Sequence, residues 1–211
     1  MPGAPNRPPE NAPAAPAPPP VPVSARFRAL SRLAPSRVAL LLDPWKGAPS
    51  PELLQPFEKA EAAFEHGDFD NASSALDLLS VRFAEPRWPT LPEPFRSLKV
   101  PIPAPMPPHW NPDHALGPAE REARRARREA DEQVALAAGS LAWAAGHGVD
   151  LTDLARPLDE ARAILGSEGV VPGYYERMET VWDGVRQRCP RPKGAAGRAP
   201  APPAEPEASE A

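Results

Sequence analysis

The sequence predicts an all-α protein, a small irregular helical bundle over residues 24–189 with disordered termini on either side. Apolar residues recur at alternating intervals of three and four in four separate stretches, which is the spacing of one face of a helix. One short run fits a strand, and no second run offers it a pairing partner. Most of the 34 prolines among the 211 residues lie in the two termini and in residues 84–118, which sets these three segments apart from the helices.

Both termini are rich in proline and alanine, and the first 23 residues alone hold ten prolines. Such segments bury too little apolar surface to offset the entropy that is lost on ordering. We therefore expect disordered tails at 1–23 and 190–211 and a single helical domain at 24–189.

The first helix is expected to begin after Ser24, whose side chain can cap it. Its apolar face consists of Phe27, Leu30 and Leu33. Pro35 is expected to interrupt this helix. The run 37–43 (RVALLLD) fits a buried helix turn or a strand, and we favour the helix. A strand ending in Asp43 would be typical of a nucleotide-binding α/β enzyme, but no glycine-rich phosphate loop follows it.

The next segment predicts two helices joined by a short turn. Residues 50–52 (SPE) suit a helix start, with a capping serine, a first-position proline and a carboxylate near the positive end of the helix dipole. Pro56 is expected to kink or restart this helix. Gly67 suits the end of the first helix, and Asp68 can cap the second. The two apolar faces are Leu53, Phe57, Ala60 and Phe64, and then Phe69, Ala72, Leu76, Leu79 and Phe83.

The turn of this hairpin, residues 67–72 (GDFDNA), resembles the inter-helix turn of tetratricopeptide-like repeats. In that family a glycine, an acidic residue, an aromatic residue and an alanine recur in this order. The resemblance covers residues 51–85, whereas an array of such repeats needs at least three. The family pattern is absent at three positions, Pro56, Lys59 and Leu79. The resemblance implies contact with another protein.

Residues 84–118 combine eleven prolines with large apolar side chains. The apolar residues are Trp88, Leu91, Phe95, Leu98, Val100, Ile102, Met106 and Trp110. This combination predicts an extended strap packed over the helices, because prolines lower the entropy cost of fixing such a chain. The alternative is a disordered docking peptide.

From Pro118, one long helix is expected to run to about His147. Arginines and acids alternate in its first half, and four pairs have i,i+4 spacing: Glu120–Arg124, Arg125–Glu129, Arg127–Asp131 and Arg128–Glu132. The interleaved acids favour a solvated, salt-bridged helix over a nucleic-acid-binding one. A seam of small side chains would allow another helix to approach closely, within the chain or from a second copy. The seam consists of Ala119, Ala123, Ala126, Ala130, Val134, Ala137, Leu141 and Ala145.

Two further helices complete the predicted bundle. Pro157 requires the first of them to begin late, with Asp153 as its cap. Its apolar face is Leu151, Leu154, Leu158, Ala161 and Leu165. After a turn at 166–173, the last helix carries Tyr174, Met178, Val181 or Trp182, Val185 and Cys189, and it ends before Pro190.

Charge and cysteine content exclude several classes of protein. The chain has 24 basic and 28 acidic residues, and no segment has the basic excess that nucleic-acid binding requires. Its single cysteine, Cys189, permits no intrachain disulfide and no cysteine-based zinc site, and it predicts a reducing compartment. The spacing of Cys189 predicts a packed thiol at the end of a helix.

The four histidines do not define a metal site. His109 and His114, with Asp113 between them, could begin one, but no matching ligand cluster occurs elsewhere in the sequence. His66 and His147 each precede a glycine at a predicted helix end, where an imidazolium faces the negative end of the dipole. We therefore expect no metal and no cofactor.

These features favour a non-catalytic protein-protein interaction or accessory protein, since the chain combines a helical hairpin with the absence of known catalytic motifs. A protein partner or a homodimer and a cytoplasmic location are expected. Nucleic acid is not expected as a partner, because no segment has a basic excess. A membrane is not expected either, because no apolar run approaches the roughly 18 residues of a membrane span. The candidate interaction residues are Trp45, Trp88, Phe95, Trp110, Ala137 and Leu141, and the alternative for each tryptophan is that it anchors an irregular segment.

Two alternative functions stay open. One is an enzyme of unfamiliar type, built on carboxylates and on the histidines of residues 84–118. The other is a nucleic-acid-associated protein that uses the helix from Arg121 to Arg128.

Overall fold

A computed structural model describes residues 23–42, 49–99 and 117–193. In these ranges the chain forms six α-helices and two short 3₁₀ helices, without a β-strand. They are α1 (Ala25–Ala39), α2 (Pro51–Glu65), α3 (Phe69–Ala84), η2 (Phe95–Leu98), α4 (Pro118–Gly146), η3 (Thr152–Leu154), α5 (Ala155–Ser167) and α6 (Pro172–Arg188). The all-α prediction is confirmed. None of these helices has both the length and the hydropathy needed to cross a lipid bilayer.

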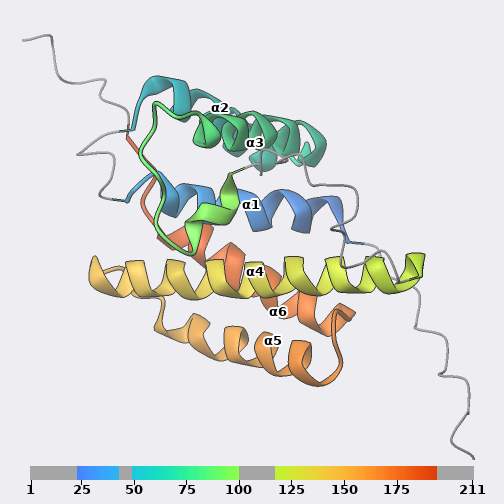
Figure 1. Cartoon of the computed structure of the whole chain (residues 1–211). Coiled ribbons are helices and arrows are strands. Elements are labelled where there is room, and N and C mark those ends of the chain that lie inside the picture. Colours follow the sequence, from blue (N-terminus) through green and yellow to red (C-terminus); the bar gives the residue numbers. More distant parts are fainter. Residues whose placement is uncertain (1–22, 43–48, 100–116, 194–211) are drawn as a thin grey trace, which may run out of the picture.

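Helix α1 lies in the middle of the bundle (Figure 1). The α2–α3 hairpin packs on one side of α1, α4 and α6 pack on the other, and α5 packs against α4 and α6. Eleven of the fifteen residues of α1 are buried, which is typical of a helix surrounded by others. The predicted face Phe27, Leu30 and Leu33 is buried with them.

The α2–α3 hairpin forms as its turn chemistry predicts. The side chain of Ser50 accepts a hydrogen bond from the backbone N–H of Glu52 at 3.3 Å, and that of Asp68 accepts one from Asn71 at 3.1 Å. Gly67 joins the helices with a φ of 77°, a conformation that costs glycine no steric strain. The predicted apolar faces of both helices are buried, apart from the half-buried Phe69.

The predicted interruption of the first helix at Pro35 is wrong. Pro35 lies inside the continuous helix α1, so residues 37–39 complete this helix instead of forming a separate one. Pro56 likewise lies inside α2, so the predicted restart does not occur there, whereas the predicted kink stays a prediction. A proline inside a helix costs about 3 kcal/mol through its missing N–H and its ring. Both prolines are buried against neighbouring helices, and this packing outweighs the local penalty.

The predicted cap of α5 is also wrong. The helix begins at Ala155, directly after η3, and no side chain caps it. Asp153 instead accepts two hydrogen bonds from the guanidinium of Arg188 on α6, at 2.5 and 2.9 Å. Pro157 is the third residue of α5, where its missing N–H has no intrahelical partner to lose. The side chain of Asp153, predicted from local spacing to cap α5, thus forms an ion pair with a residue 35 positions away.

A buried ion pair joins α1 to α2. Arg37 and Glu61 are only 3% and 5% exposed, and their side chains form a salt bridge. Arg37 also donates hydrogen bonds to the carbonyl oxygens of Arg186 and Cys189, which lie at the end of α6. Arg191 adds a longer ion pair to Glu61, 3.4 Å from nitrogen to oxygen. Burial, together with Arg191 and Arg186, lowers the pKa of Arg37 to about 10, so Arg37 stays charged at neutral pH.

The first half of the proline-rich segment packs on the bundle. Leu91, Phe95 and Leu98 are buried, and η2 contacts both α1 and α4. A Cβ atom at Gly139 of α4 would lie only 2.5 Å from the ring of Pro94, so the absence of a side chain lets this segment approach the helix. Residues 100–116 lie outside the described residues, as do most of the two predicted disordered tails.

Candidate functional site

A cleft of about 490 Å³ lies between α1, α3, α4 and α6. We call it the α1–α4 cleft. The lining residues that define it are Arg28, Arg32, Asp70, Glu132, Gln133 and Tyr175. Its size is within the usual range for sites that hold a ligand.

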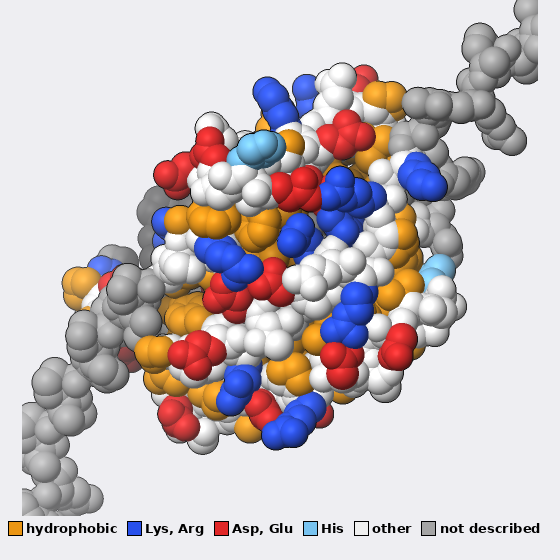
Figure 2. Space-filling view, turned by 180° about the vertical axis from the view of Figure 1, so that it is seen from behind, with side chains coloured by type: hydrophobic (Ala, Val, Ile, Leu, Met, Phe, Trp, Pro, Cys, Tyr) orange, Lys and Arg blue, Asp and Glu red, His pale blue; other side chains and the backbone are white. Residues whose placement is uncertain are grey.

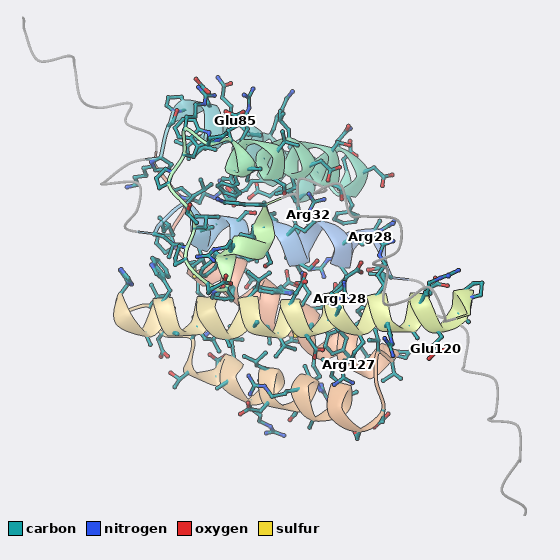
Figure 3. The ribbon with its side chains drawn as sticks, viewed as in Figure 1. Arg28, Arg32, Glu85, Glu120, Arg127 and Arg128 are labelled. Atoms are coloured by element: carbon teal, nitrogen blue, oxygen red, sulfur yellow. The ribbon has the colours of Figure 1, made fainter. Side chains whose placement is uncertain are left out.

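The α1 wall of the cleft is basic. Arg28 and Arg32 are four residues apart on one helix, so they lie on the same face. Arg32 forms an ion pair with Asp77 of α3 at 2.8 Å. Arg28 is exposed and forms no ion pair with any residue in the described ranges. Figure 3 shows both arginines on α1, above the edge of α4 that carries Arg128.

The opposite walls are acidic. Glu129 and Glu132 come from α4, and Asp70 comes from the first turn of α3. Glu129 forms the predicted ion pair with Arg125 at 2.9 Å. The carboxylates of Glu132 and Asp70 have no ion-pair partner among the residues that the structure describes. The predicted pair Arg128–Glu132 is therefore not formed, which leaves Glu132 available at the cleft.

Aromatic rings form the floor of the cleft. Tyr175 packs edge to face on Phe27, with ring centres 5.1 Å apart. The buried Tyr174 donates a hydrogen bond from its hydroxyl to the carbonyl oxygen of Ala130, at 3.1 Å. Burial raises the pKa of Tyr175, and the nearby carboxylate of Glu129 raises it further, because both disfavour a phenolate. Both tyrosines therefore stay protonated at neutral pH.

One polar group on the floor lacks a partner. The side-chain oxygen of Gln133 is buried, and no hydrogen bond to it is found within the described part of the chain. A buried acceptor without a donor costs about 1–3 kcal/mol. This oxygen is inaccessible to solvent, so it is a local cost within the fold and not a contact for an occupant of the cleft.

The predicted interaction residues do not gather at this cleft. Ala137 and Phe95 are buried in the chain's own core, where they are unavailable to a partner. Trp88 is half-buried, with the guanidinium of Arg87 4.6 Å from its ring centre. Trp45 and Trp110 lie outside the described residues.

Leu141 lines a separate groove where α4 meets η3 and the start of α5. This groove has a volume of about 450 Å³ and is mostly apolar, with Val149 and Leu151 beside Leu141. At the start of α4, Ala119 and Ala123 of the small-residue seam are exposed, whereas Ala130 is buried against the chain's own helices. The middle of the seam therefore serves packing within the chain.

The arginine-rich part of α4 is engaged in local contacts. Arg125 and Arg127 form the predicted i,i+4 ion pairs with Glu129 and Asp131. Arg127 also donates to the carbonyl oxygen of Leu165 on α5. On the opposite side of the molecule, the face shown in Figure 2, basic and acidic side chains are interspersed as well. This arrangement gives no support to a nucleic-acid surface.

The histidines and the cysteine have structural surroundings. His66 and His147 cap α2 and α4, and their Nδ1 atoms lie 2.7 Å from the carbonyl oxygens of Ala62 and Trp143. The buried Cys189 follows α6, and burial raises the pKa of its thiol to about 11. In the described ranges no group of three His, Cys, Asp or Glu side chains could hold a metal ion. His109, Asp113 and His114 lie outside these ranges.

Comparison of the chain with protein-family models, with curated proteins and with solved structures finds no match. The resemblance of residues 51–85 to a tetratricopeptide-like hairpin thus stays a prediction from their sequence.

Proposed function

We propose that this protein is a non-catalytic interaction or accessory protein, and that the α1–α4 cleft holds a segment of its protein partner. The observation that carries the proposal is the set of unpaired charges of both signs, Arg28 against Glu132 and Asp70, around a floor of aromatic rings. Tyrosine and arginine are enriched in protein interfaces, and tyrosine offers a large contact area at low entropy cost. A polypeptide segment can satisfy charged, polar and aromatic groups together.

Two sequence features support the same proposal. The tetratricopeptide-like resemblance of residues 51–85 favours contact with a protein, although these residues contribute to the cleft only through the start of α3. A cytoplasmic location belongs to the proposal as well, because a single cysteine is typical of chains that work in a reducing compartment.

Site-specific photo-crosslinking in the source organism tests the proposal. A photoreactive amino acid is placed at Ser73, which lines the cleft, and as a control at Thr180, which is exposed on α6 outside it. We expect irradiation to join one protein to the Ser73 variant and none to the Thr180 variant. The purified adduct partner should then bind the wild-type chain at least tenfold more tightly than the Arg28→Ala variant.

Two outcomes would contradict the proposal. Adducts that form equally well from both positions would show that the cleft is not the contact surface. Turnover of a small molecule by the purified chain, with no adduct from Ser73, would favour the alternative of an enzyme.

A further inference from the structure

We infer that the partner segment in the α1–α4 cleft carries one acidic and one basic side chain, the acid directed to Arg28 and the base to Glu132 and Asp70. The inference rests on the proposed function and specifies the chemistry of the partner. Some charges of the cleft are already neutralised within the chain, and the partner segment neutralises the others.

Five charges at the cleft divide into two kinds. Arg32 is neutralised by Asp77, and Glu129 is neutralised by Arg125. Arg28, Glu132 and Asp70 have no such partner in the described ranges, so the Arg28 guanidinium lies more than 4.0 Å from both carboxylates. The chain therefore offers one cation and two anions, from three different helices, to whatever enters the cleft.

Charge complementarity then selects the occupant. A phosphate-rich ligand would be attracted to Arg28 but repelled by the carboxylates of Glu132 and Asp70, and a uniformly basic peptide would be repelled by Arg28. A segment with both charges satisfies both walls. Charges of opposite sign on one chain also fix the direction in which the segment lies, because its reversal would place like charges together.

The floor of the cleft suits the same segment. The ring of Tyr175 can hold the apolar stem of a lysine or arginine and attract its cationic head. The occupant defined by these groups is a peptide segment with a basic residue over Tyr175.

Selection from a phage-displayed library of random peptides tests the inference. The target is the immobilised full chain, and the library is also selected against the variants Arg28→Glu and Glu132→Lys. A matched control, Glu122→Lys, makes the same charge change on the exposed part of α4 outside the cleft lining. Circular dichroism of each variant verifies that it remains helical.

We expect the wild-type chain and Glu122→Lys to enrich peptides that contain both an acidic and a basic residue. The Glu132→Lys variant should bind these peptides at least tenfold more weakly and should enrich peptides without the basic residue. The Arg28→Glu variant should lose the preference for the acidic residue in the same way.

The outcomes separate this inference from the proposed function. Peptides that crosslink to a photoreactive residue at Ser73 but show no charge preference would overturn the inference and leave the proposed function intact. Peptides that bind the wild type and the Arg28→Glu, Glu132→Lys double variant equally would contradict both. Self-association of the chain through the cleft, lost in the same double variant, would also overturn the inference, because the occupant would then be a second copy.

Discussion

Replacing Glu61 by leucine should destabilise the protein by about 3–5 kcal/mol, the usual cost of leaving one member of a buried ion pair without its partner. Arg37 is 3% exposed, so water cannot replace the lost carboxylate. Arg191 does not compensate, because it is itself a cation. With a urea dependence of about 2 kcal/mol per molar for a small protein, the unfolding midpoint should fall by about 1.5–2.5 M.

A double-mutant cycle isolates the contribution of the pair. Replacing Arg37 by leucine also removes the donor for the carbonyl oxygens of Arg186 and Cys189, so this single change should cost more than Glu61→Leu. The double variant buries no lone charge, and its loss should be at least 2 kcal/mol smaller than the sum of the two single losses. Urea unfolding followed by far-ultraviolet circular dichroism and by tryptophan fluorescence measures all three variants.

The control is the exposed pair Arg125–Glu129, whose side chains are 81% and 62% exposed. Its coupling energy should be about 0.3–0.5 kcal/mol. The reasoning is refuted if the Arg37–Glu61 cycle gives a coupling energy as small as this control. If Glu61→Leu does not fold, Glu61→Gln provides the milder change, and it should still cost more than any change to the exposed pair.

Three further predictions concern packing, reactivity and pH. Gly139→Ala should destabilise the protein by about 1–3 kcal/mol in thermal unfolding, because the added methyl group meets Pro94. Gly166→Ala has open space around it and should stabilise the protein by about 0.5 kcal/mol. Stabilisation by both changes would contradict close packing at η2. Cys189 should react with a thiol reagent only after unfolding, so equal rates in the folded and the urea-unfolded chain would refute its burial. The chain's two tyrosines have raised pKa values, so tyrosinate absorbance should develop well above pH 10 in the folded protein and near pH 10 in urea. Stability should then fall as the pH rises past about 10, since the unfolded state loses these protons first.

Regular periodicity predicted the helices well, because a buried stripe at 3.6-residue spacing is a local property of the sequence. The hairpin, the long helix α4 and the buried face of α6 all agree with that spacing. The break at Pro35, the restart at Pro56 and the cap at Asp153 are wrong predictions because local rules apply to an isolated helix. Burial of the two prolines and the ion pair of Asp153 with Arg188 come from residues distant in sequence.

The α1–α4 cleft could not be found in the same way. Its residues are Val23 and residues of the four helices α1, α3, α4 and α6, and none of them belongs to a catalytic or binding motif. The i,i+4 spacing of Arg28 and Arg32 was the only local signal. Glu132 was assigned to a pair with Arg128 that spacing allows, and only the side-chain positions show that this pair does not form.

Arg37 illustrates the same limit in the core. It precedes a run of apolar residues, and the spacing of that run does not indicate that the arginine is buried. Its partner Glu61 lies on a different helix, among charged residues that look solvent-exposed in sequence. Pairing of the two is decided by how α1, α2 and α6 come together, which no local rule describes.

The central position of α1 also affects how the chain can fold during synthesis. Arg26 of α1 bonds to Asp183 of α6, which follows it by 157 residues. At about 5–20 residues per second, the ribosome takes about 8–30 s to add those residues. Throughout that interval the apolar face of α1 lacks the helix that completes its burial. A nascent chain that stops before α6 would therefore leave the α6-facing side of α1 exposed to chaperones and proteases. Such a truncated chain should be degraded more readily than the full-length chain.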